Sequence, residues 1–267
     1  MKKILLLLLF LGICLSQAPR ASALRVAVGA QTLRVSDSAR IIDGSTYVPL
    51  RAAMAELRGE AQVTWERGRA VVRSDALELT AVPGEQYLVA NGRYLYAAGG
   101  IFLENGVLYV PLRQLAKALG MTASWNAGVA SLTPGTGAIE PAETYYREDA
   151  LYWLSRIISA ESRGEPLLGQ IAVGNVVLNR VASSDFPNTI YGVIFDDRWG
   201  GQFEPVRNGT VYQEPAAISV IAAKLVLDGA DAVGHCLYFL APHLTDNHWT
   251  MENREYVTTI GNHWFYA

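Results

Sequence analysis

The first half of the chain contains an internal repeat, and this repeat restricts the folds open to that half. Residues 42–51 read Ile-Asp-Gly-Ser-Thr-Tyr-Val-Pro-Leu-Arg, and residues 103–113 read Leu-Glu-Asn-Gly-Val-Leu-Tyr-Val-Pro-Leu-Arg. Each copy predicts a tight Asp-Gly or Asn-Gly hairpin turn, a short strand, and a proline at the first position of a helix. A sequence repeated in this way predicts that one supersecondary unit occurs twice in the fold.

The two copies continue alike beyond this repeated segment. In each copy a glycine is placed to end the helix, and a strand with Trp65 or Trp125 follows before a turn and a closing strand. Between the copies, residues 87–96 are expected to fold over Asn91-Gly92 as a further hairpin. We therefore expect residues 24–133 to form a small α+β domain with a duplicated core.

The N-terminus predicts export. Lys2 and Lys3 precede an apolar run over residues 4–15, and Ala21-Ser22-Ala23 is a small-x-small cleavage site. This pattern is typical of a secretory signal peptide, here residues 1–23. The alternative is a retained membrane anchor, but the apolar run is shorter than the ~20 residues that span a bilayer. We expect no stable membrane span after cleavage.

Charge and cysteine content narrow the class further. The formal net charge is −3, which gives no broad basic field, so we expect no nucleic-acid partner. After signal cleavage Cys236 is the one remaining cysteine, and we expect it to be a buried structural thiol. An exported protein without disulfides fits a bacterial envelope. Nothing in the sequence predicts an oligomeric state.

A domain boundary is predicted over residues 134–144. This stretch begins Pro-Gly-Thr-Gly, has a proline near its end, and has little apolar content, which is typical of a linker. The second domain is then expected over residues 145–267.

Glu161 is the outstanding side chain of the second domain. Residues 148–161 predict a helix whose apolar stripe includes Leu154 and Ile157, and Glu161 continues that stripe just before a Gly-Glu-Pro turn. An ionised acid on a buried face is costly, so we expect its pKa to be raised, as a general acid requires at neutral pH. The alternative is a surface acid at a fraying helix end.

Further helices are predicted around this one. Residues 166–181 are apolar almost all round, which indicates a central, buried helix. Asn175 and Asn179 lie four residues apart on it, and we expect them to tie down neighbouring loops rather than to face the site. A third helix is expected over residues 215–229, and a strand over residues 237–240.

The repeat resembles the copper amine oxidase N-terminal-like stalk domain, through Tyr-Val-Pro-Leu-Arg in both copies and the downstream tryptophans. The name suggests copper, but no histidine precedes His235, and copper sites use imidazole or sulfur ligands. We therefore interpret this domain as a binding or spacing module without a metal. Arg51 and Arg113 are expected to be structural or solvated.

The second half closely resembles the SleB/CwlJ family of cell-wall hydrolases, collinearly over residues 152–267. The motifs are Ser-Ala-Glu-Ser-Arg-Gly-Glu-Pro at 159–166, Gly-Gln-Ile-Ala-Val-Gly-Asn-Val-Val-Leu-Asn-Arg-Val at 169–181, Phe-Pro-Asn-Thr-Ile at 186–190, Gly-Gln-Phe-Glu-Pro-Val at 201–206 and Ile-Gly-Asn-His-Trp-Phe-Tyr at 260–266. The resemblance implies a mainly helical lysozyme- or lytic-transglycosylase-like fold with a small β element. It also implies degradation of spore-cortex peptidoglycan during germination, with Glu161 as the catalytic glutamate and no cofactor. Such a protein is secreted to the envelope or spore cortex of a Gram-positive-type bacterium.

The number of carboxylates distinguishes two mechanisms of glycan cleavage. A hydrolase normally adds a second carboxylate, whereas in a lytic transglycosylase the muramic acid 6-hydroxyl attacks and one acid/base residue serves both steps. Candidates for a second carboxylate are Glu165, Asp196, Asp197, Glu204, Asp246 and Glu252. Glu165 is expected to cap the next helix, and the others have no distinctive position. The resemblance therefore implies a transglycosylase with a single glutamate, and the sequence permits it.

Sugar binding calls for aromatic faces and amide groups. Our candidates are Gln202, Phe203, Trp199 and Tyr238. Each aromatic candidate has a core role as its alternative.

Two other functions remain open from the residues alone. A zinc amidase would use the histidines, yet none of their spacings gives the i, i+4 helical pair of a His-Glu-x-x-His site. The histidines are His235, His243, His248 and His263. The second alternative is a non-catalytic protein whose two domains bind the cell wall without cutting it.

Overall fold

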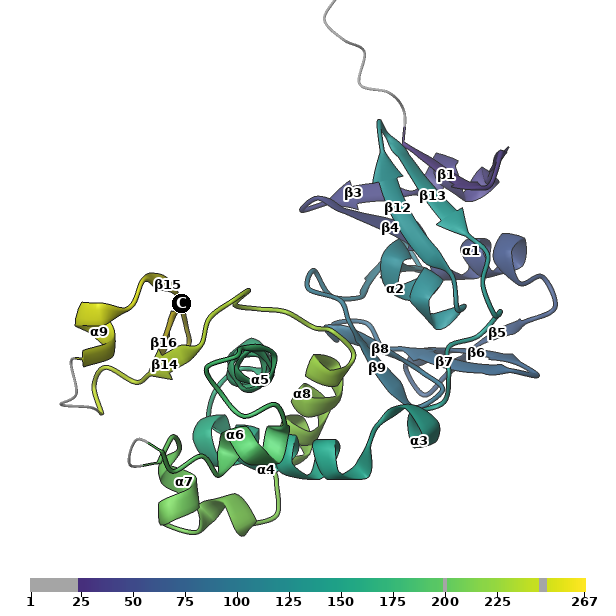
Figure 1. The fold of residues 1–267 in the computed structure, drawn as a ribbon. Coiled ribbons are helices and arrows are strands. Elements are labelled where there is room, and N and C mark those ends of the chain that lie inside the picture. The colour runs from purple at the N-terminus through teal and green to yellow at the C-terminus, as the bar shows by residue number, and fades with distance from the viewer. Residues whose placement is uncertain (1–23, 199–200, 245–248) are drawn as a thin grey trace, which may run out of the picture.

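The computed structural model describes residues 24–198, 201–244 and 249–267, which form two units (Figure 1). A unit rich in strands comes first along the chain, and a mainly helical unit with a small sheet follows. This is the α+β organisation expected from the sequence. The predicted signal peptide, residues 1–23, lies outside the described residues. No helix in the described ranges combines the length and the apolar character needed to cross a membrane.

The N-terminal unit is built around two strands that are equivalent in the repeat. β4 (Ser45–Pro49) pairs antiparallel with β11 (Val107–Pro111), and Val48 lies opposite Val110. Because these valines occupy the same position of the repeat, the two copies are related by a local twofold axis through this pair. After its central strand each copy adds a helix and a hairpin: α1 (Leu50–Leu57), β5 (Gln62–Glu66) and β6 (Arg69–Ser74), then α2 (Leu112–Ala118), β12 (Thr122–Asn126) and β13 (Val129–Thr133).

The remaining strands extend the two copies differently. The hairpin of the first copy grows into a sheet of order β5-β6-β7-β8-β9, whereas that of the second copy is extended by β1, which runs parallel to β13, in the order β12-β13-β1-β2. The central pair is flanked in the order β10-β11-β4-β3. These elements are β1 (Arg25–Val28), β2 (Gln31–Thr32), the 3-10 helix η1 (Arg34–Ser38), β3 (Arg40–Ile42), β7 (Leu77–Ala81), β8 (Tyr87–Ala90), β9 (Arg93–Tyr96) and β10 (Phe102–Glu104).

The hairpin turns confirm the sequence analysis. Asp43-Gly44, Asn91-Gly92 and Asn105-Gly106 each have positive φ at both residues, which is the conformation of a two-residue turn that matches the strand twist. The start of each repeat helix was predicted one residue too early. Pro49 and Pro111 end their strands and stand as the residues before α1 and α2, with extended ψ values of 118° and 130°.

The segment between the units is held against the N-terminal unit. Ile139 is buried in the core of that unit, and its N–H donates to the carbonyl of Ala118 at 2.9 Å. The Asn91 side chain donates to the carbonyl of Ile139 at 3.0 Å. The short helix α3 (Ala142–Tyr145) follows. A sparse linker was expected here, but one apolar side chain and these hydrogen bonds fix its path.

Three helices form the centre of the C-terminal unit: α4 (Glu148–Ser162), α5 (Leu167–Ala182) and α8 (Ala217–Leu227) pack against one another and confirm the predicted helices. A sheet of order β14-β16-β15 lies beside α5 (Figure 1). Its strand β14 (Tyr238–Leu240) was predicted, whereas β15 (Tyr256–Ile260) and β16 (His263–Tyr266) were not. Short helical turns complete the unit: α6 (Ile190–Ile194), α7 (Glu204–Arg207), η2 (Thr210–Tyr212) and α9 (Trp249–Asn253).

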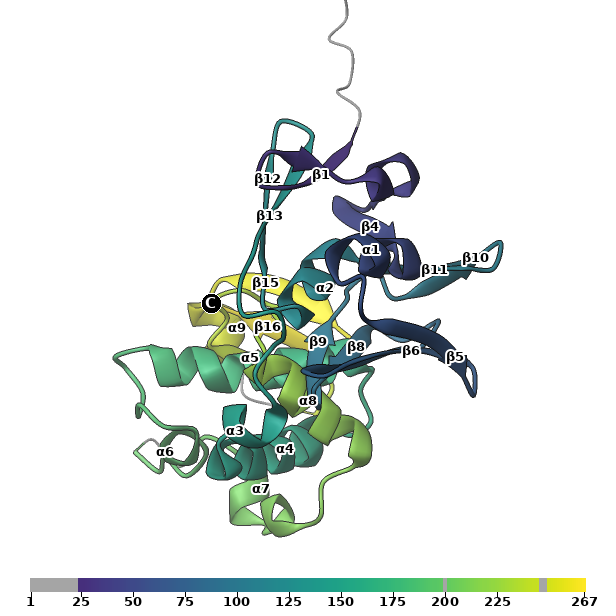
Figure 2. The ribbon, with the colours of Figure 1, turned by 90° about the vertical axis from the view of Figure 1, so that its right-hand side faces the viewer.

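The two units meet where α8 packs against β9 (Figures 1 and 2). Asp228, at the end of α8, is buried and accepts from the Arg93 Nε of β9 at 3.0 Å. The Lys117 ammonium donates to the Asp228 carbonyl at 2.6 Å, and the Tyr146 hydroxyl donates to the Asp228 carboxylate. The Arg93 guanidinium also lies over the Tyr145 ring, 3.2 Å from its centroid. One carboxylate therefore joins the N-terminal unit, the connecting segment and the helical unit.

Candidate functional site

Glu161 lies in the last turn of α4, whose apolar face is buried. Leu154, Ile157 and Ile158 on that face are fully buried in the core of the helical unit. Glu161 is partly exposed, and the pKa of its carboxyl is raised to about 7, chiefly by burial. The positive charge of Arg180 opposes this shift, and the negative charge of Glu204 adds to it. The expectation of a raised pKa is confirmed.

The Glu161 carboxyl opens onto a pocket of about 370 Å³. The wall comes from the end of α4 on one side and from α7 and η2 on the other. The lining residues are Ala160, Glu161, Arg163, Glu204, Pro205, Asn208, Thr210 and Gln213. Most of these side chains are polar, so the pocket offers several hydrogen-bonding groups beside Glu161.

Glu204 brings a second carboxylate to this pocket. It is the first residue of α7, its side chain is exposed, and Arg207 Nε donates to its carboxylate at 2.8 Å. In the sequence it was one of several acids without a distinctive position. Its place in the Gly-Gln-Phe-Glu-Pro-Val motif is a signal that could have singled it out, but sequence reasoning did not use it. The structure thus adds Glu204 to the site beside Glu161.

Arg180 is the main positive charge that acts on Glu161, and sequence reasoning did not single it out. It is buried on α5, and its Nε donates to the carbonyl of Leu237 at 2.7 Å. Its Nη1 is buried and has no hydrogen-bond partner among the described residues. Burial lowers the pKa of Arg180 to about 10, while Tyr238, Glu161 and Asp196 each act to raise it. The guanidinium thus stays cationic at neutral pH.

Aromatic rings surround the Arg180 guanidinium. Its central carbon lies 5.0 Å from the ring centroid of Phe186, 5.3 Å from that of Phe203 and 5.6 Å from that of Tyr238. Phe203 is 3 % exposed and belongs to the core of the helical unit. The prediction that Phe203 contacts sugar therefore conflicts with its burial, and the core alternative holds, because a ring enclosed on both faces offers no surface to a ligand.

The other sugar-binding candidates are placed as follows. Tyr238 is half-buried on β14, and its hydroxyl accepts from Arg254 Nη2 at 2.9 Å. Gln202 is partly exposed in the loop before α7. Trp199 lies outside the described residues, so its role stays a prediction.

The remaining carboxylate candidates have other roles or positions. Asp196 is buried and bound by Arg198, whose hydrogen bonds hold the pKa of Asp196 below its ordinary value. Asp197 and Glu252 are exposed and do not line the Glu161 pocket. Asp246 lies outside the described residues.

Glu165 does not cap α5, contrary to the prediction. Its carboxylate instead accepts from the backbone N–H of Asn262 at 2.9 Å and from the Asn262 side-chain amide at 2.8 Å. Asn262 lies in the turn between β15 and β16. α5 begins after Pro166 without any side-chain cap. Glu165 is therefore a tie between the α4–α5 turn and the β15–β16 hairpin.

The amides on α5 have the structural role that was expected. Asn175 donates to the carbonyl of Ala230 at 2.7 Å and accepts from the N–H of Ala232 at 2.9 Å. Asn179 donates to the carbonyls of Gly234 and Cys236 at 2.6 and 2.9 Å. These bonds hold the loop between α8 and β14 against the central helix.

Cys236 is fully buried within that loop region, and burial raises the pKa of its thiol. This confirms the expectation of a buried thiol. His263 is also buried, and burial lowers its pKa. Within the described ranges no group of three or more histidine, cysteine, aspartate or glutamate side chains is arranged to hold a metal ion. His248 lies outside those ranges.

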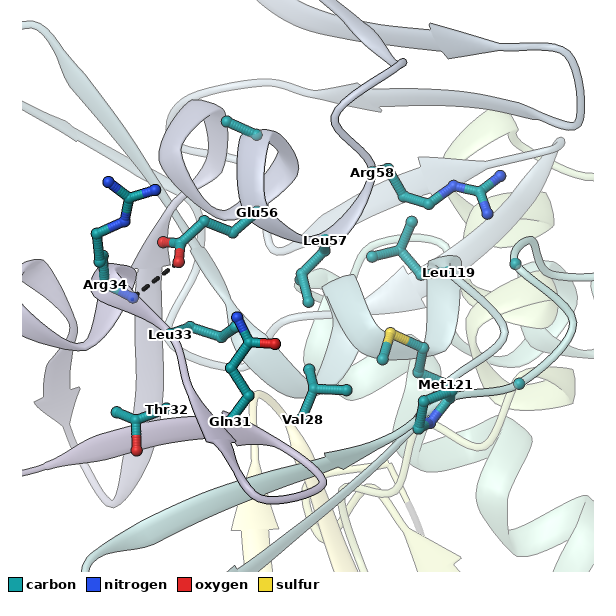
Figure 3. Close-up of a pocket in the computed structure, with 14 residues that line it drawn as sticks. Val28, Gln31, Thr32, Leu33, Arg34, Glu56, Leu57, Arg58, Leu119 and Met121 are labelled. Carbon is teal, nitrogen blue, oxygen red and sulfur yellow. Dashed lines mark hydrogen bonds between the residues drawn. The ribbon is translucent and has the colours of Figure 1, made fainter.

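A larger pocket, about 510 Å³, lies in the N-terminal unit (Figure 3). It is lined by the β1–β2 region, the end of α1 and the segment after β13. Its one carboxylate, Glu56, accepts from the backbone N–H groups of Arg34 and Val35 at 2.8 and 2.7 Å. Because that carboxylate is already hydrogen-bonded to the backbone, this pocket offers no acid–base group comparable with Glu161.

The geometry defines a two-unit protein whose helical unit carries a carboxyl of raised pKa, Glu161, in a polar pocket. The helical unit matches the cell wall hydrolase family over residues 164–266, and the strand-rich unit matches the copper amine oxidase N-terminal domain over residues 27–133. Both resemblances seen in the sequence are thereby confirmed. The first match begins just after Glu161, so it does not include that residue.

Curated relatives agree with the first match. The spore cortex-lytic enzyme of Bacillus cereus is 38% identical over 120 residues, which cover 45% of this chain and 45% of that protein. Its counterpart in Oceanobacillus iheyensis is 34% identical over 133 residues, which cover 50% of this chain and 46% of that protein. The cell wall hydrolase CwlJ of Oceanobacillus iheyensis is 32% identical over 103 residues, which cover 36% of this chain and 72% of that protein.

The chain belongs to the cell wall hydrolase family. It spans about half the length of the spore cortex-lytic enzymes that it matches. Among solved structures, the catalytic domain of the germination-specific lytic transglycosylase SleB from Bacillus anthracis is 36% identical, with a TM-score of 0.42. That match covers 46% of this chain and 97% of the solved chain.

Proposed function

We propose that the protein is an exported peptidoglycan-degrading enzyme that cleaves the glycan strand between MurNAc and GlcNAc, with Glu161 as its general acid/base. The observation that carries this proposal is the Glu161 carboxyl, which has a pKa of about 7 and lines an open polar pocket. A carboxyl with that pKa is half protonated near neutral pH, so it can give a proton and take one back.

A lytic transglycosylase reaction uses this property in two steps. Protonated Glu161 donates its proton to the glycosidic oxygen, and the bond from that oxygen to the muramic acid C1 breaks. The resulting carboxylate then accepts the proton of the muramic acid 6-hydroxyl, whose oxygen attacks C1 and forms the 1,6-anhydro product. Glu161 ends in the protonated state in which it began. The positive charge of Arg180 stabilises the carboxylate between the two steps.

The substrate we propose is spore-cortex peptidoglycan, degraded during germination, since several relatives are named spore cortex-lytic enzymes. The protein then acts in the envelope or spore cortex of a Gram-positive-type bacterium. We assign residues 145–267 to a catalytic domain of lysozyme- or lytic-transglycosylase-like fold, 24–133 to the stalk-like domain and 134–144 to the linker. Gln202, Trp199 and Tyr238 remain our candidates for sugar contacts.

The products released by wild type and by Glu161→Gln test this proposal. Each is incubated with purified cortex and with vegetative sacculi, and the muropeptides are identified by mass spectrometry. We expect anhydro-muramic ends from wild type on cortex, and roughly 10²- to 10⁴-fold slower release by Glu161→Gln. The matched control Glu140→Gln changes an exposed glutamate outside the site and should retain wild-type activity. Equal release by wild type and Glu161→Gln would refute the assignment.

One observation supports a second mechanism, because Glu204 lines the same pocket as Glu161. In an inverting hydrolase a second carboxylate acts as general base and activates water. The products would then carry reducing ends, and Glu204→Gln would abolish their formation. In the transglycosylase mechanism Glu204→Gln still forms anhydro ends, because the substrate hydroxyl is the nucleophile.

A further inference from the structure

The N-terminal unit carries two pockets that are equivalent under its local twofold axis. One pocket, of about 410 Å³, contains Trp65, and the other, of about 110 Å³, contains Trp125. In each, the floor is the strand–helix junction of one copy and the tryptophan lies on the hairpin that follows. The facing wall is the Gly-containing turn of the other copy, with Gly106 in the first pocket and Gly44 in the second. A pocket that requires both copies has thus been formed twice.

Each pocket offers an aromatic platform beside a cation. Trp65 is 50 % exposed and Trp125 is 48 % exposed, which is unusual for the largest apolar side chain. Arg51 lines the first pocket and Arg113 the second. Both arginines are exposed, and within the described chain neither guanidinium makes a hydrogen bond or ion pair that would occupy it. Sequence reasoning treated these arginines as structural or solvated.

These two groups select the chemistry of a ligand. The flat indole face matches the C–H face of a pyranose ring, because both are apolar surfaces of similar size with polar groups at the edge. The guanidinium presents a planar fork of N–H donors that fits a carboxylate. A net charge of −3 and a single arginine in each pocket do not suit a polyphosphate backbone.

We propose that the Trp65 and Trp125 pockets bind a carboxylate-bearing amino-sugar glycan, with the ring stacked on the indole and the carboxylate on Arg51 or Arg113. Peptidoglycan strands have this chemistry, because their sugars carry lactyl-linked peptides that end in carboxylates. The pockets are separate from Glu161, and binding to them does not require that Glu161 be catalytic. Two sites on one rigid unit gain affinity for a repeating strand through avidity.

The two sites are not equal. The turn that faces Trp65 supplies Val107 and Leu108, whereas the turn that faces Trp125 supplies Ser45 and Thr46 at the equivalent positions. The first pocket is therefore both larger and more apolar, and we assign it the stronger binding.

Binding to insoluble sacculi tests the proposal, with the mature chain carrying Glu161→Gln so that the ligand is not degraded. In cosedimentation assays we expect Trp65→Ala to weaken binding roughly five- to ten-fold and Trp125→Ala less, because each truncation removes one stacking platform. The double variant should bind more weakly than either. The Arg51→Ala/Arg113→Ala double variant should also bind native sacculi more weakly than the parent. Amidated sacculi have lost their carboxylates, so the double variant and the parent should bind them equally well.

Arg25→Ala and Ile41→Ala are the matched controls. Each removes an exposed side chain of the same unit that lines neither pocket, so both variants should bind like the parent. Tm measurements show which variants are folded, and Trp65→Phe, which keeps an aromatic face, should retain most of the binding. Unchanged binding by the folded Trp65→Ala/Trp125→Ala variant would overturn the proposal. Equal binding of native and amidated sacculi by the parent would overturn its carboxylate component.

Discussion

Glu161 is subject to two opposing influences that together set its pKa. Burial favours the neutral carboxyl, and the buried Arg180 cation favours the carboxylate. Burial is the larger influence, and the balance leaves the pKa at about 7. A deeper site without Arg180 would hold the proton too tightly to act as a base, and a solvated site would lose it before acting as an acid.

The raised pKa of Glu161 makes the stability of the protein depend on pH. Below pH 4.5 the group is protonated in both the folded and the unfolded state, and its environment costs nothing. As the pH rises from 4.5 to about 7, the unfolded state ionises first, so folded stability falls, by about 3 kcal/mol in total. Glu161→Gln lacks this loss, so its Tm should equal that of wild type at pH 4 and exceed it at pH 8.

Thermal denaturation of both proteins from pH 4 to pH 8 measures this difference. Glu140→Gln serves as the control, because its exposed side chain should leave the Tm difference flat across the range. A Tm gain for Glu161→Gln that is the same at every pH would mean that the Glu161 carboxyl is not perturbed by burial.

Arg180 should set the upper pH limit of activity. Its charge lowers the pKa of Glu161, so Arg180→Gln should shift the basic limb of the kcat–pH profile to higher pH. Arg180→Lys keeps the charge and should leave the limb closer to that of wild type. The position of the limb distinguishes this role from a structural one, because loss of the hydrogen bond to Leu237 lowers stability without moving the limb. An unmoved limb in Arg180→Gln would rule the role out.

At the scale of elements, the sequence predicted the helices and hairpin turns that local residue patterns determine. Apolar residues at helical spacing identified α4, α5 and α8, and the Asn-Gly and Asp-Gly pairs identified the hairpins. β15 and β16 were missed, although the Gly261-Asn262 pair that joins them is itself a local hairpin signal. The role of Glu165 was mistaken because a glutamate before Pro166 is a good local cap, and only the fold shows that Asn262 is its partner.

The sequence likewise predicted only the part of the site that a local pattern determines. Glu161 was identified because its position at the end of an apolar stripe is visible in the sequence. Glu204 and Arg180 act on Glu161 from separate elements, α7 and α5, so no local pattern indicates their proximity. Phe203 was left between a sugar contact and a core role, because the sequence cannot distinguish an aromatic that faces the pocket from one that packs beneath it; the structure places it in the core.

The tie between Glu165 and the β15–β16 hairpin predicts a specific coupling. Gly261 has φ of +59°, and a Cβ at this position would lie 1.8 Å from Glu165 Oε2. Gly261→Ala should therefore destabilise the protein by more than the roughly 1 kcal/mol that left-handed strain alone costs. In a Glu165→Ala background the contact with the Glu165 carboxylate is removed and Pro166 Cδ, 3.3 Å from the added Cβ, is the close neighbour that remains, so the added cost of Gly261→Ala should be smaller.

Urea denaturation of the two single variants and the double variant measures this cycle. Gly234→Ala is the matched control, because Gly234 has φ of +56° but open space around its Cβ position. Its cost should be the same with and without Glu165→Ala. Strict additivity of Gly261→Ala and Glu165→Ala would show that the side chain of Glu165 does not occupy the turn.

At the scale of the whole molecule, the contact between the units decides whether they act as one body. The tyrosines of β8 and β9 pack against the core of the helical unit, and Lys224 of α8 lies 5.0 Å from the ring centroid of Tyr94. Asp228 adds a buried charge that meets Arg93 and Lys117. These contacts predict that the two units move as one body, with the tryptophan pockets and the Glu161 pocket in a fixed relation.

Asp228→Asn tests this rigidity. The substitution keeps the shape of the side chain but leaves the buried Arg93 guanidinium without its counter-charge, which typically costs about 3–5 kcal/mol. We expect a lower Tm and, because the contact between the units is weakened, separation of one thermal transition into two by calorimetry. Glu66→Gln, which breaks an exposed pair with Arg73, should change the transition little. A single transition at the wild-type Tm in Asp228→Asn would show that the units are joined by apolar packing alone.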